Sequence, residues 1–349
     1  DTASFLRNLL AHNEGRNWSL GGGLSGDGYY WGHLDITNNV VFNYGGRATD
    51  GGAHEVNFVN NYYKEGNSST RSRMLRAQHE GVGLGTQKYY YRGNVLERYR
   101  SETGYSIECD GITNQLCGYS DQWDASETRY TATVDEPFFP SYATVLTANH
   151  AFKNVISDCG ASMPALDEHD LRVALEARDG TWKYKGSYTG KWGIPDHHLD
   201  VGGYENYDTI TLNLDEFDTD RDGLPNWWEV EVSKTNPKGA VGDFTETNTD
   251  PDNDGMTHME RYLEFMATPN FATKANSAIA IELSQYTRGY TKSPVYSVVA
   301  NGDGAVVING NYARFTPAAD FKGVTYFTFK VKDADGDEMT RKVAVRVRE

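Results

Sequence analysis

Short segments of alternating apolar and polar residues repeat along the first hundred residues of the chain. Residues 33–42 (HLDITNNVVF) and 54–63 (HEVNFVNNYY) are near copies, each with an Asn-Asn pair between two β-prone runs, and a weaker copy lies at 87–97. A unit this short cannot bury its apolar side alone and must stack on the next unit. The repeat therefore predicts a β-solenoid over residues 1–205, with an earlier coil at residues 4–13.

The last part of the chain has a strand pattern of a different kind. Phe327, Phe329 and Val331 alternate with polar residues, and turns rich in Gly, Asn and Asp separate the short apolar runs. This spacing is typical of a small β-sandwich, which we predict at residues 271–349. Three aspartates share one of these turns, and a hairpin explains them more simply than a cation does: Asp333, Asp335 and Asp337.

Short helices are expected near residue 170 and after each of the two acidic loops described below. Residues 167–177 begin with acidic side chains, which suit a helix N-terminus. Residues 257–266 place four apolar side chains on one face. Residues 101–150, with Gly, Asp, Thr and Pro spread through them, are expected to be an irregular excursion from the solenoid or a loop at the edge of a groove.

The strongest motif lies in the middle of the chain, in a segment that we expect at residues 206–270. DTDRDGLPNWWE fits the calcium-loop pattern D-x-D-x-D-G-x5-E without a gap. Carboxylates at alternate positions converge when such a loop wraps a cation, and the glycine permits the sharp turn. The predicted ligands are three aspartates, one backbone carbonyl and a closing glutamate: Asp218, Asp220, Asp222, Leu224 and Glu229.

A second copy of this loop follows, with a less regular end. DPDNDGMTHME places its glutamate one position early, and Arg261 stands at the usual position. Its predicted ligands are Asp250, Asp252, Asp254, Met256 (backbone carbonyl) and Glu260. The two loops resemble the calcium-loop pairs of dockerins and thrombospondin-type repeats, so Ca²⁺ is the expected cofactor and its role is expected to be structural.

Charge is concentrated around these loops. The net charge is −16, and residues 201–270 carry 16 acidic against 4 basic side chains. This local acidity favours cations and argues against nucleic acid as a partner. No apolar run is long enough to span a membrane. The high aromatic and glycine content suits a secreted protein, extracellular or periplasmic, and the N-terminus reads as cut inside repeat sequence.

The three cysteines cannot all pair with one another. Cys109 and Cys117 are close enough in sequence for a small loop disulfide, which would leave Cys159 outside it. Buried thiols are the alternative, and the sequence does not decide between them. Because no C-x-x-C pair or histidine cluster is present, metal binding by cysteine is not expected.

The order of several motifs resembles one enzyme family. The runs LLAHNEGRNWSLGGG, DITNNVVFNYGGR and NFVNNYYK resemble pectate lyases of the parallel β-helix type, over about residues 1–200. The resemblance implies a right-handed parallel β-helix and a calcium-assisted β-elimination on a galacturonate polysaccharide. It also implies that Arg16 is the base. A guanidinium, whose pKa lies above about 12, needs an unusually acidic proton and an electropositive site for that role.

The sequence departs from the family motif R-x-P-x-x-R. Trp18 replaces the proline, Ser19 an inner position, and Gly21 the second arginine. In that family the calcium carboxylates come from coils before the base, and few residues precede Arg16 here. The expectation is that the calcium half lies on another segment, such as an N-terminal part of the same precursor. The alternative for Arg16 is a surface arginine at a coil corner.

Other arginines are candidates for binding an acidic sugar. Arg47 lies on a loop between coils, where it can contact a uronate carboxylate or form an ion pair with Asp50. A basic cluster follows a glycine- and serine-rich turn, and either attracts an acidic polysaccharide or is a solvated loop: Arg71, Arg73 and Arg76.

Asparagines recur at one point of the coil. Asn tolerates the left-handed conformation of a tight bend, and stacked Asn side chains can hydrogen-bond along a solenoid. We therefore interpret these residues as structural: Asn38, Asn39, Asn60, Asn61 and Asn94.

Two hypotheses on function follow. The first is a secreted polysaccharide lyase of the pectate-lyase type, for pectate or for another uronate polymer. The second is a non-catalytic β-solenoid that binds carbohydrate or serves adhesion, joined to calcium-stiffened modules. In either case the C-terminal sandwich resembles the immunoglobulin- or cadherin-like modules of secreted bacterial enzymes.

Overall fold

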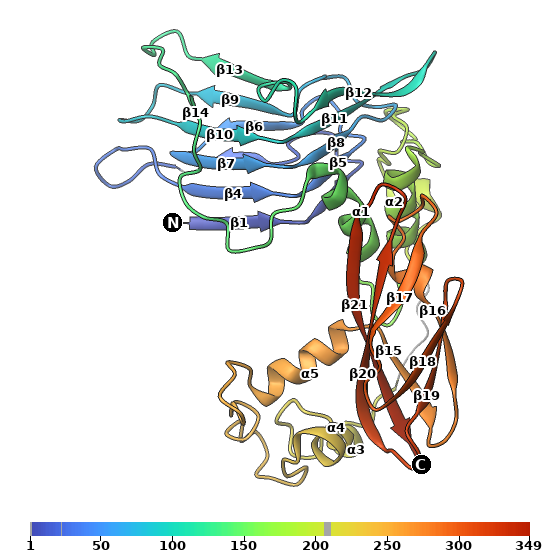
Figure 1. Ribbon diagram of the computed structural model, residues 1–349. Helices are drawn as coiled ribbons and strands as arrows, with labels where there is room; N and C mark the ends of the chain where they lie inside the picture. The colour runs from blue at the N-terminus through green and yellow to red at the C-terminus, as the bar shows by residue number, and fades with distance from the viewer. Residues whose placement is uncertain (1, 22, 206–210) are drawn as a thin grey trace. The chain divides into compact units, whose positions relative to one another are not determined.

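The computed structural model describes residues 2–21, 23–205 and 211–349. The protein is mostly β, with 34% of residues in strands and 15% in helices. It divides into two compact units (Figure 1). The first unit contains Asp1–Gly160 and Glu168–Tyr204, and the second contains Ala161–Asp167 and Glu205–Glu349.

The first unit is built from three sheets that the chain visits in turn, coil after coil (Figure 1). The first sheet has the order β1-β4-β7-β10-β14: Thr2–Leu6, His33–Thr37, Glu55–Val59, Lys88–Arg92 and Thr133–Val134. The second has the order β2-β5-β8-β11-β12: Leu9–Ala11, Val40–Phe42, Tyr62–Lys64, Val95–Arg100 and Gly104–Asp110. The third has the order β3-β6-β9-β13: Ser19–Gly21, Thr49–Gly52, Leu75–His79 and Tyr119–Trp123. Every pairing is parallel except the β11–β12 hairpin.

The register of the sheets confirms the repeat seen in the sequence. His33 pairs with Glu55 and Ile36 with Phe58, so the two near copies stack position on position. Ile36 and Phe58 are fully buried in one core between the sheets, together with inward residues of the other coils. Each coil thus covers the apolar side of its neighbour.

An asparagine ladder connects the coils at the bend between the first and second sheets. The Asn39 side-chain amide donates to Asn61 Oδ1, and that of Asn61 donates to Asn94 Oδ1, each at 3.0 Å. Asn8, which the sequence analysis did not include, donates to Asn39 Oδ1 at 2.9 Å. The preceding residues, Asn38 and Asn60, have positive φ angles of 58° and 49° and form the bend itself. The predicted structural role of the asparagines is therefore supported. One asparagine of each pair forms the bend, and the other hydrogen-bonds to the next coil.

Two of the three sheets are covered on their outer side. Helix α1 (Ala148–Asp158) packs on the second sheet through a cluster that includes Val155 and Tyr62, and α2 (Glu168–Asp179) follows it. The segment 135–147 crosses the first sheet, where Asn57 is hydrogen-bonded to the backbone of Phe138 and Phe139.

The third sheet keeps an open outer face, as far as the described residues go. Asp50, Arg76 and Ser120 form one outward row across it. Gln78 pairs with Gln122 in the next outward row, and Gln122 is exposed. This face is therefore open to a ligand.

The second unit contains a β-sandwich, as predicted (Figure 1). One sheet has the order β15-β21-β20-β17: Asn270–Lys274, Glu338–Arg348, Gly323–Lys332 and Val295–Ala300. The other has the order β16-β19-β18: Ile279–Glu282, Tyr312–Pro317 and Gly304–Asn309. Phe327, Phe329, Val343 and Val345 are fully buried between the sheets, which confirms the period of two.

The acidic segment packs on the outer side of this sandwich. It contains α3 (Leu214–Phe217), α4 (Asn226–Trp228) and α5 (His258–Ala267). Trp228 and Phe265 form a buried cluster with Ala344 of β21. Arg346 of the same strand lies 3.9 Å from the centre of the Trp227 ring. The helix predicted at 257–266 is thus α5, displaced by one residue at each end.

The expectation of an irregular excursion at residues 101–150 is wrong for its first part. Gly104 has a φ of 74° and forms the tight turn from β11 into β12, and β13 follows at Tyr119–Trp123. The mixture of polar and glycine residues that suggested a loop reflects the half-exposed position of these strands. Cys109 and Cys117 form a disulfide, and Cys159 keeps its thiol. Among the described helices, each is too short or too polar to cross a lipid bilayer.

Candidate functional site

Four arginines that the sequence analysis singled out line one pocket on the third sheet. The pocket has a volume of about 220 Å³ and lies where β6 and β9 begin. Two neighbouring coils supply its walls, because residues 46–50 and 71–76 occupy the same turn of successive repeats. Its charged lining residues are Arg47, Asp50, Arg71, Arg73 and Arg76. Four guanidinium groups against one carboxylate make this pocket suited to an anionic ligand.

Asp50 holds two of these arginines in place. Its Oδ2 accepts a hydrogen bond from Arg47 Nε at 2.5 Å and one from Arg76 Nη2 at 2.8 Å. The Asp50 side chain is buried, whereas those of Arg47 and Arg76 are partly exposed. The sequence analysis left open whether Arg47 pairs with Asp50 or contacts a ligand. The structure contains the ion pair, and Arg47 still lines the pocket.

Arg73 is held separately, and Arg71 faces solvent. Arg73 Nη1 donates to Ser120 Oγ of β13 at 3.3 Å. Arg71 is exposed, and its backbone carbonyl accepts a hydrogen bond from Tyr44. Charged hydrogen bonds fix three of the four guanidinium groups, so little conformational entropy remains to be lost when an anion binds.

Arg16 lies beside this pocket in the preceding coil. Its chain neighbour Asn17 donates from its backbone to Ala48 O at 2.8 Å and from its side chain to Arg47 O at 3.1 Å. A Cβ atom on its other neighbour, Gly15, would lie 3.4 Å from Arg47 Cβ. Arg16 itself is exposed and has a positive φ of 58°. It is not among the residues that line the pocket, but both of its chain neighbours contact Arg47, which does line it.

A buried charged group ties α2 to the coils, and the sequence did not reveal it. His12 Nε2 lies 2.8 Å from Glu176 Oε2, and Arg172 Nη1 lies 3.0 Å from the same oxygen. The side chains of His12 and Glu176 are each 6% exposed. The sequence gives no signal for this contact, because Glu176 lies more than a hundred residues from His12.

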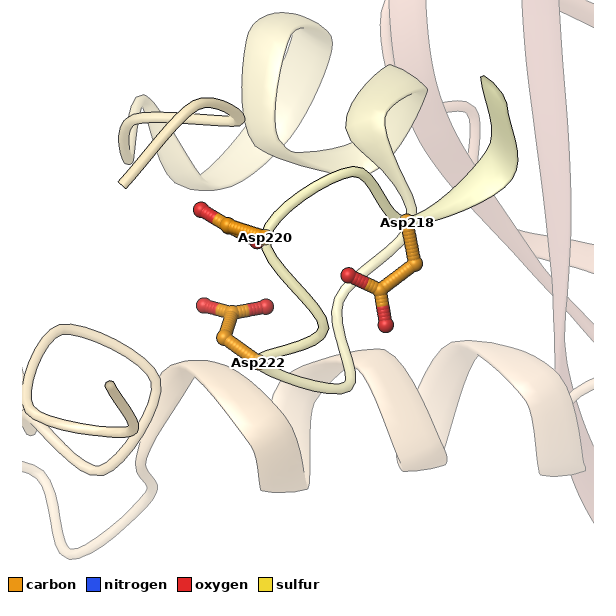
Figure 2. A group of neighbouring side chains, drawn as sticks. All are labelled: Asp218, Asp220 and Asp222. Atoms are coloured by element: carbon orange, nitrogen blue, oxygen red, sulfur yellow. The ribbon is translucent and has the colours of Figure 1, made fainter. Parts of the chain in front are cut away.

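The first acidic loop forms a cluster of converging carboxylates in the second unit. Oxygens of Asp218, Asp220 and Asp222 lie within 4.8 Å of one another, and Figure 2 shows the three side chains leaving one loop. Gly223, with a φ of 93°, makes the turn, and its N–H donates to Asp218 Oδ2 at 3.1 Å. The loop thus has the shape that the motif predicts.

This cluster is buried and incompletely hydrogen-bonded. Asp220, Asp222 and Glu229 are at most 3% exposed. One oxygen each of Asp218, Asp220 and Glu229 is buried without a hydrogen-bond partner among the described residues. Burial, followed by repulsion from the three aspartates, raises the pKa of Glu229 to about 7. Buried carboxylates without partners are costly unless a cation compensates them, so these residues fit Ca²⁺.

Residues outside the motif close the loop, and no sequence signal pointed to them. Gly239 N donates to Asp220 Oδ2 at 2.8 Å, and Thr235 Oγ1 donates to Glu229 Oε1 at 3.1 Å. Thr247 Oγ1 donates to Asp222 Oδ2. The segment between the two loops therefore covers the first one and buries its carboxylates. The Leu224 side chain is buried in the apolar cluster, and its N–H donates to Asp222 Oδ1 at 2.9 Å.

The second acidic loop has the same backbone conformation, but an arginine neutralises its aspartates. Arg261 Nη2 lies 2.9 Å from oxygens of both Asp252 and Asp254. Glu260 is turned toward its own helix, where Oε2 accepts a hydrogen bond from Thr257 N at 2.7 Å in a capping box. The structure thus gives Glu260 a capping role that differs from the predicted one. Asp250 and Met256 keep the loop turn, because Gly255 N donates to Asp250 Oδ2 and Met256 N donates to Asp254 Oδ1.

A third acidic cluster lies in the sandwich, in the turn between β20 and β21. Asp333, Asp335 and Asp337 have oxygens within 4.8 Å of one another. Asp335 forms an ion pair with Lys292 at 2.9 Å, and Asp333 accepts from Asp335 N at 3.1 Å. Hairpin hydrogen bonds and a lysine thus account for much of this cluster, in agreement with the simpler interpretation.

Comparison with known proteins identifies one part of the chain. Residues 265–346 match the family of bacterial Ig domains. This match covers the sandwich and the end of α5, and it supports the predicted immunoglobulin-like module at the C-terminal end. No curated protein matches the chain.

Proposed function

We propose that this protein is a secreted polysaccharide lyase, with the first unit folded as a right-handed parallel β-helix of the pectate-lyase type. The observation that carries the proposal is the arginine pocket on the open sheet, with Arg16 beside it. The parallel coils and the asparagine ladder agree with such a fold. A galacturonate-type polysaccharide carries the carboxylates that four guanidinium groups would bind.

In the proposed reaction a base removes the proton from carbon five of a uronate ring. The electrons of that C–H bond form a double bond between carbons four and five, the C4–O bond breaks, and the leaving oxygen takes up a proton. The pocket arginines would bind the uronate carboxylate and disperse the charge that develops next to carbon five. Arg16, exposed beside the same pocket, is the candidate base.

The residues of the pocket do not fit a catalytic calcium ion. Asp50 is the one carboxylate in its described lining, and two arginines already occupy it. The proposal therefore routes no step through calcium at this site. We assign Ca²⁺ to the buried loop of Asp218, Asp220, Asp222 and Glu229, where it would be structural.

Capture of acidic polysaccharide without cleavage is the second candidate function. The arginine pocket favours it, because Asp50, the carboxylate of its described lining, is already bound to two arginines, and binding requires the arginines alone. Secretion suits both candidates, since a disulfide and a calcium-dependent module are stable outside the cytosol. The two candidates differ only in chemistry at the bound sugar.

The test separates binding from cleavage. Wild type and Arg16→Ala are incubated with polygalacturonate while the ultraviolet absorbance of unsaturated uronate is followed, and binding is measured in parallel by calorimetry. The lyase proposal expects absorbance to rise with wild type and not with Arg16→Ala, whose binding persists. Arg129→Ala, a change at an exposed arginine of another loop, is the control. Binding without any absorbance change in the wild type would favour capture, and no binding would reject both candidates.

A further inference from the structure

Two loops that follow strands of the third sheet form an exposed apolar surface. One is residues 23–31 after β3, and the other is residues 80–86 after β9. Five large apolar side chains are exposed on them, with Tyr29 at 54% and Trp31 at 45%. We call this surface the aromatic loop patch: Leu24, Tyr29, Trp31, Val82 and Leu84. Exposed apolar side chains gathered in one place usually mark a binding surface.

The two loops hold each other in a defined shape. Tyr30 N donates to Leu84 O at 3.0 Å, and Leu84 N donates to Gly28 O at 2.8 Å. Tyr30 Oη also accepts a hydrogen bond from Val82 N at 3.2 Å. The rings of the patch are therefore presented on a paired backbone.

Glycines in the second loop make room for the rings and side chains of the first. A Cβ atom on Gly83 would lie 2.5 Å from Leu24 Cδ2 and 3.0 Å from a Tyr30 ring carbon. A Cβ atom on Gly85 would lie 3.5 Å from a Tyr29 ring carbon. The alternating glycines of the sequence GVGLG thus allow the loops to approach closely. This packing fixes the positions of the tyrosine rings before any ligand binds.

The patch and the arginine pocket lie at opposite ends of β9. Arg76 begins the outward row of β9 beside the pocket, and Val82 lies just beyond the end of that strand. β9 spans about 13 Å at the usual rise of a strand. The outward side chains between the two ends include Gln78, which is polar and partly exposed. A single sugar ring is too short to reach both ends.

We infer that the aromatic loop patch is a second contact point for the polysaccharide chain whose uronate is bound by the arginine pocket. Aromatic rings bind the apolar faces of sugar rings, and Tyr29 and Trp31 present such rings to solvent. This inference rests on the proposed function, and it assigns the protein to long substrates rather than to mono- or disaccharides.

The experiment measures binding of galacturonate oligomers of increasing length to the full chain by calorimetry. We expect wild-type affinity to rise with length beyond the dimer. Trp31→Ala and Tyr29→Ala should each weaken binding of the long oligomer about tenfold, the effect of one lost aromatic contact. Binding of the dimer should not change. Tyr188→Ala, which removes a side chain that is 93% exposed in another loop, is the matched control.

The outcomes distinguish the inference from the proposed function. Arg71→Ala should weaken the dimer and the long oligomer alike. If it does so while Trp31→Ala and Tyr29→Ala bind the long oligomer like wild type, the patch is not part of the sugar site and the inference is overturned. If wild type binds no galacturonate oligomer at all, the proposed function is rejected, and the inference is rejected with it. Light scattering tests for self-association of the protein. If two wild-type chains associate, and Trp31→Ala separates them without loss of sugar binding, the patch is a protein interface and the inference is overturned. Circular dichroism confirms folding of each variant.

Discussion

Glu229 and Arg261 occupy the same position of two loops that share one backbone conformation. Arg221 and Asn253 have φ angles of 57° and 56° in the two loops, and each following glycine has a φ of 93°. In the first loop the position carries a buried carboxylate beside three aspartates. In the second it carries a guanidinium bound to two aspartates. The second loop is therefore neutralised by its own arginine, whereas the first loop gathers four carboxylates.

The first prediction concerns removal of calcium. Chelation of a folded sample should destabilise the second unit, because the buried oxygens of Asp218, Asp220 and Glu229 lose their compensating charge. Calcium at a hundred times its Kd would contribute about 2.7 kcal/mol to the free energy of unfolding. Thermal unfolding with calcium and with a chelator measures the difference. Asp220→Asn should reduce it, whereas Asp252→Asn in the second loop should not.

The calcium prediction has a clear negative outcome. Equal melting temperatures with calcium and chelator, together with no heat of calcium binding, would show that the first loop is stable with its carboxylates protonated or solvated. In that case the raised pKa of Glu229 would be a property of the loop as it stands without calcium.

The second prediction converts the second loop into a calcium site. Arg261→Glu removes the guanidinium that neutralises Asp252 and Asp254 and places a carboxylate where the first loop has Glu229. Calorimetry should detect one additional calcium equivalent per chain relative to wild type. Arg261→Gln, which removes the charge without adding a ligand, is the control and should bind the extra ion weakly. An unchanged calcium stoichiometry for Arg261→Glu would contradict the prediction. It would mean that a glutamate at position 261 does not complete a calcium site while Glu260 caps α5.

The sequence allowed prediction of the features that depend on short-range patterns. The coil repeat, the alternation of Phe327 and Phe329, and the first acidic loop are all encoded within a few residues. Contacts between distant segments were not predictable. Thr247 closes the first loop from 25 positions away. The role of Arg261 also required coordinates, because the same residue at the end of an imperfect motif could equally face solvent.

The arginine pocket lies between features that short-range patterns predict and contacts that only the coordinates reveal. Arg47 and the cluster at 71–76 were separate candidates in the sequence. They meet because successive coils stack in register, which places Asp50 beside Arg76. A repeat therefore predicts neighbours across coils only once its period is known, and the longer turn before β9 obscured that period.

The third prediction tests the asparagine ladder. Asn61→Ala removes the acceptor of the Asn39 backbone and side-chain amides, at 3.0 Å each, and the donor to Ile36 O. Buried donors left without partners should lower the free energy of unfolding of the first unit by about 3 kcal/mol. Urea unfolding measures the effect. Asn8→Ala is the matched control: it lies in the same ladder with an exposed side chain and should cost less. Equal costs at both positions would contradict the argument from burial.

The fourth prediction concerns acid unfolding of the first unit. Burial alone would raise the pKa of Glu176, but hydrogen bonds from His12 and from Lys183 N, together with the charge of Arg172, outweigh it and lower the pKa below its ordinary value of 4.5. A depressed pKa stabilises the fold above the ordinary value, because the unfolded chain takes up the proton first as the pH falls. Stability should therefore decline as the pH falls from about 4.5 through the folded-state pKa.

Glu176→Gln tests this linkage. At pH 7 the variant should be less stable than wild type, because it loses the charged contacts with His12 and Arg172 at 2.8 and 3.0 Å. The gap between the two urea midpoints should narrow as the pH falls below 4.5. Glu168→Gln, at the exposed start of the same helix, should have little effect at either pH. A gap that stays constant from pH 7 to pH 3 would show that the glutamine acts through packing, and that the ionised form of Glu176 contributes nothing to holding α2 on the coils.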